Sequence, residues 1–442
     1  MTNKRFTTVC EVVSWRLCMG CGACAVACRE NNIRLVNVPE QGLRPVVNPA
    51  RCQKCGECVK VCPGIEVSHQ PFNGQTITEL QQAWGPVLEL WEGYATDPET
   101  RFKGSSGGVV TALALFCLEK EQAAVVLHIG AKSEAPLQNA PVFSRSREEL
   151  LACTGSRYSP AAPCERLRCI GEAKAPCVFI GKPCDVVGLR KSQAMNEELN
   201  KKVSLAISIF CAGTPSTNGT RALLDVLDVK PNQVAAIRYR GCGWPGMTTV
   251  TIKGSGGQTR KMTYEESWGN ILSHYGQFRC RLCPDSTGEF ADISCGDPWY
   301  REIELNDPGW SLVVVRTERG REILQKAATA DYIELKRVNP SALWLSEKAL
   351  LSRRYHLWGR LLAMRMMQVP IPRYKGFSLF KNWLRLPAME KLRSVGGTLK
   401  RIILRRWTKP LKPIKQGNIG REVNSAEGTL VNLDRFESQC KV

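Results

Sequence analysis

The sequence predicts three parts in chain order: a small cysteine-rich α+β domain, an α/β domain with a mixed sheet, and a basic, mainly helical C-terminal extension. Eight closely spaced cysteines mark the first part, between residues 18 and 62. Apolar segments of strand length alternate with helical segments from about residue 85 to 345, which is typical of α/β domains. Between residues 353 and 415, seventeen Lys or Arg stand against one acid, Glu390.

The 442 residues are enough for such a division at about 100–200 residues per domain. We place the domains at 1–78, 79–345 and 346–415, followed by a polar tail over 416–442 that we expect to be poorly ordered. No apolar run reaches the ~18 residues of a membrane-spanning helix. The N-terminus lacks the apolar core of a signal peptide, so we expect a cytoplasmic protein. In that compartment, 21 cysteines indicate metal or redox chemistry rather than disulfides.

The cysteines of the first part form a repeated motif with the spacing C-x-x-C-x-x-C-x-x-x-C, and the second copy begins 34 residues after the first. In bacterial-type ferredoxins, such a run gives three ligands to one 4Fe–4S cluster and the fourth to the other cluster. Two copies therefore predict two 4Fe–4S clusters in a ferredoxin-like domain. By this crossing rule, the ligands are Cys18, Cys21, Cys24 and Cys62 for the first cluster, and Cys52, Cys55, Cys58 and Cys28 for the second.

Neighbouring residues agree with this interpretation. Gly22 and Gly56 allow the close backbone approach and the amide-to-sulfur hydrogen bonds of such loops. Pro63 follows the second run, whereas Arg29 stands at the matching position of the first. Structural zinc sites are the alternative, because thiolates also bind zinc, but a doublet of four-cysteine runs favours iron–sulfur clusters.

The α/β domain is predicted from apolar runs bounded by turn residues. The predicted strands cover 124–130, 176–181, 203–210, 234–240, 248–253 and 311–317, and the clearest helices cover 107–120, 185–200 and 217–227. Cys184 and Cys211 each come directly after one of these strands and before a helix. Ligands in open α/β sheets gather at this carboxyl edge of the strands.

A third cluster site is predicted from these two cysteines and a later pair. Cys280 and Cys283 form a C-x-x-C motif, so that Cys184, Cys211, Cys280 and Cys283 together supply four thiols for a third 4Fe–4S cluster. Cys295 is an alternative candidate for one of these four ligand positions. The alternative is that Cys184 and Cys211 are small buried apolar residues, and that the C-x-x-C pair is a redox dithiol.

A serine- and glycine-rich turn precedes the apolar helix that starts near residue 109. Its sequence, FKGSSGG over 102–108, offers a serine cap, glycines that let a phosphate approach, and the positive end of a helix dipole. A dinucleotide pyrophosphate fits such a turn, although the same pattern also occurs as a plain helix cap. No G-x-G-x-x-G follows a strand, so a standard Rossmann site is not predicted.

Together these motifs resemble the beta subunit family of coenzyme F420 hydrogenases and dehydrogenases. The resemblance covers roughly residues 10 to 330, and it is carried by the cysteine doublet and by residues 102–113, 181–190, 210–216, 280–297 and 309–320. It implies a cluster within the α/β domain and an FAD near the serine–glycine turn. The residues placed at that FAD are Lys103, Gly104, Ser105, Ser106, Gly107, Gly108 and Thr111.

The function implied is electron exchange between a two-electron partner, a deazaflavin or similar, and 4Fe–4S clusters by way of FAD. A flavin accepts two electrons together and releases them singly, so no catalytic acid or base is required and none is assigned. The alternatives are a non-catalytic electron-relay subunit and a metal-independent binding module. The expected partner is a redox protein or a deazaflavin coenzyme. The protein itself is expected to be a homo-oligomer or a subunit of a complex. Membership of the family does not identify the substrate.

The basic extension interleaves aromatic and aliphatic residues with Lys and Arg. This composition is typical of segments that lie in the interface of an anionic membrane, so we predict peripheral docking at the inner membrane face through residues 353–415. A helical extension that packs on the core or on an acidic partner is the alternative. Charge alone also fits nucleic acid, but no nucleic-acid motif accompanies it, and we expect no such partner.

Overall fold

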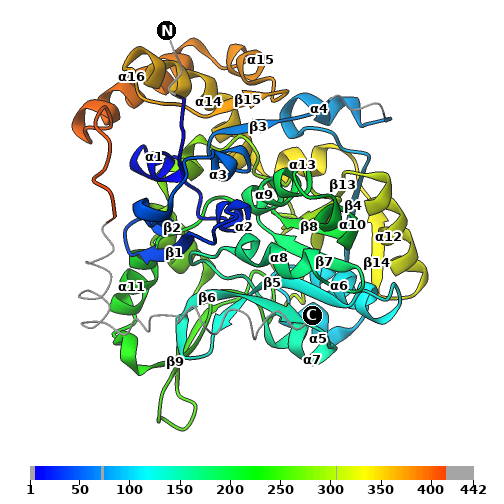
Figure 1. Ribbon diagram of the computed structural model, residues 1–442. Helices are drawn as coiled ribbons and strands as arrows, with labels where there is room; N and C mark the ends of the chain where they lie inside the picture. Colours follow the sequence, from blue (N-terminus) through cyan, green and yellow to red (C-terminus); the bar gives the residue numbers. More distant parts are fainter. Residues whose placement is uncertain (1–4, 71–73, 305, 415–442) are drawn as a thin grey trace.

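The structure, a computed structural model, describes residues 5–70, 74–304 and 306–414 (Figure 1). At its centre lies a mixed sheet of eight strands. In sheet order these are β14 (Ile333–Arg337), β4 (Glu89–Ala95), β13 (Ser311–Val315), β12 (Ile293–Gly296), β8 (Val203–Ile209), β7 (Cys177–Gly181), β5 (Val125–Lys132) and β6 (Ala135–Ser144). Strands β5, β7, β8 and β12 run parallel, while β13 is antiparallel to β12 and β4. The predicted α/β domain with a mixed sheet is confirmed.

Helices cover both faces of this sheet. Because side chains alternate along a strand, Val178 packs in the core with α6 (Val109–Glu119) and α12 (Glu318–Thr329). Its neighbour Phe179 packs in the opposite core with α8 (Leu167–Gly171), α9 (Pro183–Gln193) and α10 (Glu197–Lys202). The further helices of this region are α4 (Thr78–Trp84), α5 (Pro98–Lys103), α7 (Arg147–Ala152) and α11 (Thr217–Val226).

All six predicted strands form, but they belong to two sheets. Strands β9 (Val234–Arg238) and β10 (Thr248–Ile252) pair with β11 (Thr259–Met262) in a separate three-stranded antiparallel sheet. Strands β4, β6, β12 and β14 of the main sheet are not among the predicted ones. The helix predicted over 185–200 divides into α9 and α10, because the side chain of Asn196 caps a new helix by accepting a hydrogen bond from Leu199 N (3.1 Å).

The N-terminal domain is built from two similar turns. Helices α2 (Ala23–Ala27) and α3 (Glu57–Lys60) begin directly after Gly22 and Gly56, whose φ angles are +94° and +81°. Glycine adopts this left-handed conformation without steric cost, so both copies of the motif turn in the same way. The remaining elements are α1 (Val9–Ser14), the antiparallel hairpin of β1 (Ile33–Val38) and β2 (Gly42–Val47), and β3 (Glu66–Ser68).

The C-terminal extension packs on the N-terminal domain. It follows α13 (Ser341–Ser346) and contains α14 (Lys348–Met366), β15 (Arg373–Lys375), α15 (Leu379–Leu384) and α16 (Ala388–Leu404). Strand β15 pairs in parallel with β3, and Leu361 and Met364 of α14 share a core with Leu17 and Cys62. The extension is therefore mainly helical, as predicted, but much of its apolar surface is buried inside the molecule. Among the described residues, no helix is long and apolar enough to cross a membrane. The predicted polar tail lies outside the described residues.

A buried ion-pair network ties α14 to the segment after Cys283. Arg354 donates a hydrogen bond to Glu289 Oε1, and His69 Nε2 lies 2.8 Å from Glu289 Oε2. The side chains of Arg354 and Glu289 are 3% and 0% exposed. Burial alone would raise the pKa of Glu289, but the charge of Arg354 and the hydrogen bond with His69 outweigh burial and lower this pKa to about 2.

Replacing Glu289 with Gln should therefore destabilise the fold by about 3–5 kcal/mol, because Arg354 would keep its charge in the interior without a partner. Since the folded pKa is lowered, the contribution of Glu289 is fully present above its ordinary pKa of 4.5 and is lost as the pH falls towards 2. The stability difference between the two proteins should shrink over that window. Chemical unfolding followed by circular dichroism measures both effects.

The matched control is Glu318→Gln. Glu318 also pairs with an arginine, Arg321, but its side chain is 73% exposed. The expected loss is below about 0.5 kcal/mol. Equal losses for the two variants would contradict the buried network as a stabilising contact.

Candidate functional site

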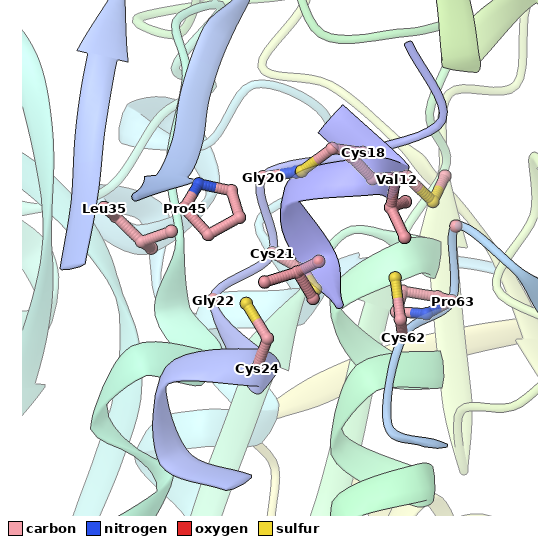
Figure 2. A pocket seen from close by; sticks show the side chains of 13 residues that line it. Val12, Cys18, Gly20, Cys21, Gly22, Cys24, Leu35, Pro45, Cys62 and Pro63 are labelled. Atoms are coloured by element: carbon pink, nitrogen blue, oxygen red, sulfur yellow. The ribbon is translucent and has the colours of Figure 1, made fainter. Parts of the chain in front are cut away.

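The four cysteines assigned to the first cluster line one cavity. Cys18, Cys21, Cys24 and Cys62 border a hollow between α1, α2 and the β1–β2 hairpin. Figure 2 shows their sulfur atoms around this hollow, with Cys62 and Pro63 on the side opposite Leu35 and Pro45. All four side chains are buried, at 7–9% exposure. The structure thus brings together the four thiols that the crossing rule joins.

Backbone amides approach these sulfurs in a repeated pattern. Gly20 N donates to Cys18 Sγ over 3.4 Å, and the backbone amides of Ala23 and Gly64 form hydrogen bonds with the Cys21 and Cys62 thiols. In each case the amide lies two residues after the cysteine. Amide hydrogen bonds to ligand sulfur are a means by which proteins set the potential of iron–sulfur clusters.

The thiols also influence one another electrostatically. Burial, followed by repulsion from Cys18 and Cys21, raises the pKa of Cys62 to about 12. Burial and the same two neighbours raise the pKa of Cys24 well above its ordinary value. A hydrogen bond from Cys164 lowers the pKa of the fourth thiol, Cys21. Convergent buried thiols of this kind fit a polynuclear cation, since a metal core compensates the buried negative charge.

The second set of four is more exposed. Burial raises the pKa of Cys58, and repulsion from Cys55, Cys52 and Cys28 adds to it, so these thiols also face one another. Asn32 N lies 3.4 Å from Cys28 Sγ. Cys55 is exposed and the other three are half-buried, in contrast to the enclosed first set.

The third set comes together at the carboxyl edge of the main sheet. Cys184 follows β7 and Cys211 follows β8, and these strands are parallel neighbours. Burial and then Cys280 raise the pKa of Cys211 to about 11, while burial, with repulsion from Cys280 and Cys211, raises that of Cys283 to about 12. Thr214 N lies 3.5 Å from Cys280 Sγ. The C-x-x-C pair is therefore near Cys211, which in turn lies near Cys184.

Cys295 lies elsewhere. It belongs to β12 and its side chain is buried in the apolar core that faces α6 and α12. Burial is the only cause that raises its pKa, to about 12. The structure therefore gives Cys295 no place among the other four thiols.

Among the described residues, no three His, Cys, Asp or Glu side chains are grouped so that they would hold a single metal ion. The cysteines of a 4Fe–4S cluster bind different iron atoms at the corners of a cube, so they are spaced more widely than the ligands of one ion.

The first and third thiol sets meet at α9. A Cβ atom on Gly188 of this helix would lie 3.4 Å from both Cys21 Sγ and Cys164 Sγ. Cys164 N donates to Cys21 O (3.1 Å), and Cys21 contributes to raising the pKa of Cys184, after burial and nearer charges. Gly188 therefore marks the point where the N-terminal domain lies against α9, the helix that carries Cys184 in its first turn.

The serine–glycine turn lies at the same sheet edge, after β4 and α5. Gly107 is buried where a Cβ atom would lie 2.6 Å from Gly93 O, and its N–H donates to Ser311 Oγ (2.9 Å). Ser106 Oγ donates to Gly296 O (3.3 Å). Gly296 in turn packs on the ring of Phe210, the residue before Cys211. Short contacts thus connect the turn to the third thiol set.

The other predicted residues of the turn either bond to groups within the protein or shape the turn. Ser105 Oγ accepts a hydrogen bond from Ser156 N (2.6 Å), and the ammonium group of Lys103 pairs with Glu99 (2.7 Å), so both groups have partners within the protein. Gly108 provides the left-handed N-cap of α6, and Gly104 closes the turn against it. Among the described residues, the first-turn amides of α6 up to Thr111 have no hydrogen-bond acceptor.

Sequence reasoning missed a buried arginine beside this turn. Arg240 donates to both carboxylate oxygens of Asp297 (2.9 and 2.7 Å) and to Ser105 O (2.5 Å). Trp244 Nε1 also donates to Asp297, over 2.8 Å. The partners of Arg240 are 57 and 135 residues away along the chain, so no local sequence motif predicts that these residues meet.

Two features of the turn and of α6 fit the phosphates of a dinucleotide. The first-turn amides of this eleven-residue helix are unpaired and lie at its positive end, and the glycines before them leave the backbone accessible. The side chains of the turn mainly hold the turn itself. The residues that would contact phosphate are therefore the amides of α6 and Thr111.

Comparison with known proteins agrees with these features. Residues 90–167 and 176–341 match the models of the N-terminal and C-terminal parts of the beta chain of coenzyme F420 hydrogenase/dehydrogenase, and residues 17–64 match the model described as "4Fe-4S dicluster domain". The coenzyme F420 hydrogenase subunit beta of Methanococcus voltae is 27% identical over 291 residues, which are 63% of this chain and 95% of that protein.

Two relatives from Methanocaldococcus jannaschii differ in their described activity. The F420-dependent formate dehydrogenase subunit beta is 25% identical over 58% of this chain and 63% of its own length, and the coenzyme F420-dependent sulfite reductase is 22% identical over 74% and 48%. A chain of the F420-reducing [NiFe] hydrogenase complex from Methanosarcina barkeri has the same fold, with a TM-score of 0.50 and 20% identity over 77% of this chain and 99% of that one. The protein thus belongs to the family of coenzyme F420 hydrogenase/dehydrogenase beta subunits and carries a 4Fe–4S dicluster domain.

Proposed function

We propose that this protein is an iron–sulfur flavoprotein that exchanges electrons between a two-electron partner, a reduced deazaflavin or similar, and three 4Fe–4S clusters through FAD. The observation that supports it most is that each thiol set adjoins the next, from the sheet edge to the more exposed second set. The third set adjoins the serine–glycine turn through Phe210 and Gly296, and it meets the first set at Gly188. The second set is the most exposed of the three.

The protein itself supplies enclosure, charge and hydrogen bonds to these sites. Burial of the first set and of Cys184 keeps water from these thiols, and the amides of Gly20 and Thr214 lie close to the sulfurs of Cys18 and Cys280. Lys182, which lies beside Asp185 (2.7 Å), lowers the pKa of Cys184 against the larger effect of burial. A cluster bound there would carry single electrons, and the exposed second set would be the exit towards a redox partner protein.

FAD is placed by the same proposal at the start of α6. The first-turn amides would hold its phosphates, and the residues from Lys103 to Gly108 would shape the turn beneath them. A bound flavin would supply the conversion between two-electron and one-electron steps. Arg240, which is paired with Asp297, donates to Ser105 O and so holds the turn in position.

The chain is either an enzyme by itself or one subunit of a larger enzyme. Relatives are described as subunits, which favours the alternative of a non-catalytic relay subunit in a larger reductase or dehydrogenase. Steady-state reduction of a small-molecule acceptor by the isolated protein, with reduced deazaflavin as donor, would identify an enzyme. We also propose that the protein is peripheral on a membrane, through the exposed side of its basic extension.

Replacement of Cys184 with Ser should remove the third cluster and leave the other two. The expected result is a loss of about one third of the iron and acid-labile sulfide per chain, because each cluster of this type has the same composition. Anaerobic purification followed by iron and sulfide determination measures the loss. Cys283→Ser should give the same result.

Cys117→Ser is the control for this experiment. Cys117 is equally buried, but it lies in α6 within the apolar core of the sheet, with no other thiol beside it in the described residues. This variant should keep the full iron content. A Cys184→Ser protein with unchanged iron would refute the third cluster while leaving the two N-terminal ones in place.

Replacement of Thr111 with Asp tests the flavin site. Thr111 is half-buried in the first turn of α6, where a carboxylate stabilises a helix but repels a phosphate. Flavin content after anaerobic purification should fall at least about tenfold, while the thermal stability and the iron content stay unchanged. Thr111→Asn has nearly the same shape without the charge and should retain flavin. Normal flavin in the Asp variant would place the phosphates elsewhere.

A further inference from the structure

Exposed apolar side chains are concentrated in the C-terminal extension. Sixteen large hydrophobic residues are exposed among the described residues, and seven of them lie between residues 366 and 404, a small fraction of the chain. They are Met366, Phe380, Leu384, Met389, Leu392, Ile403 and Leu404, at 47–70% exposure. Figure 1 shows α15 and α16 at one end of the molecule, with α14 beside them. Such a concentration indicates a contact surface rather than scattered exposure.

The orientation of α16 is fixed by close packing on α14. A Cβ atom on Gly359 of α14 would lie 2.0 Å from Ser394 Oγ, so the two helices touch at this glycine. Ser394, Thr398 and Ile402 are buried along that side of α16. At about 100° per residue, Leu392 and Ile403 lie on the opposite side. The packing of α16 on α14 therefore leaves an apolar stripe of α16 facing outwards. The helix cannot rotate this stripe inwards without losing its contacts with α14.

Positive charge borders the stripe. Residues 379–412 contain ten Lys or Arg and one acid, Glu390. Glu390 is already paired with His356 (2.7 Å) and Arg393 (3.2 Å). Exposed Arg405 and Arg406 follow directly after the exposed Ile403 and Leu404. The surface is thus apolar at its centre and cationic at its edges.

We infer that the outer face of α15 and α16 docks on an anionic lipid bilayer, with Leu392, Ile403 and Leu404 in the interface and the basic side chains at the headgroups. A convex helix with this composition fits the headgroup region of a bilayer. A second copy of the chain would bring like charges together, which disfavours self-association through this face. The inference rests on the peripheral-membrane part of the proposed function and does not depend on the clusters or the flavin.

The test is co-sedimentation of the full-length, anaerobically purified protein with vesicles. One set of vesicles contains phosphatidylcholine alone, and the other contains equal parts of phosphatidylcholine and phosphatidylglycerol. We expect binding to the second set only, with an affinity that falls as salt is added. Ile403→Glu should abolish this binding. Arg405→Glu combined with Arg406→Glu should weaken it at least about tenfold, because each basic residue contributes roughly fivefold at an anionic surface.

Val226→Glu is the matched control, because Val226 is 66% exposed, like Ile403 at 64%, but lies at the end of α11 outside the extension. It should bind vesicles as the wild type does. Iron content and circular dichroism, measured on every variant, show whether the fold and the clusters are intact. Absence of vesicle binding by intact wild-type protein, or equal binding to both lipid mixtures, would overturn the inference. So would a concentration-dependent dimer that Ile403→Glu dissociates in the absence of lipid.

Discussion

The close approach of the N-terminal domain to α9 is the constraint on which the rest of the structure depends. Helix α9 begins at the carboxyl edge of the sheet, where Cys184 and Cys211 lie, and it has a glycine, Gly188, at the point where Cys21 touches it. A Cβ there would only just fit against Ala23, Cys21 and Cys164, so a side chain larger than that of alanine would separate the first thiol set from the third. The contact therefore links two units of different architecture, a cysteine-rich domain and an α/β domain, into one series of thiol sites.

Burial of the thiols has an energetic consequence that explains their surroundings. Desolvation opposes thiolate formation at Cys24, Cys62, Cys184 and Cys283, and in each case it is the largest influence on the pKa. A polynuclear cation compensates several such charges at once, whereas the basic groups nearby are single charges, and Lys182 among them is already paired with Asp185. Folding of these regions and cluster binding are therefore expected to stabilise each other.

How far the sequence predicted this arrangement depends on the range of the contacts. The thiol sets were predictable because ligand spacing is local within each run, and because parallel strands place their following residues at one edge. Strand β6 was missed, since its segment APLQNAPVFS contains two prolines and does not alternate, and it pairs only at the border of the sheet. The cluster of Arg240 and Asp297 was missed because its members come from separate elements. The segregation of β9 and β10 into a second sheet likewise depends on pairing that local pattern does not encode.

The C-terminal extension shows that composition alone does not distinguish exposed from buried basic and apolar residues. Its seventeen basic residues suggested a surface segment, yet Arg354 is buried against Glu289, and Leu357, Leu361 and Met364 share a core with Cys18 and Cys62. Ile402 and Trp407 complete that core from the far end of the extension. Since these residues cover the back of the first thiol set, removing the extension would expose thiols that are now buried. The extension thus has two faces with separate constraints. Its inner face encloses the first set of thiols, and only its outer face, on α15 and α16, is free to combine basic and apolar residues for contact with another surface.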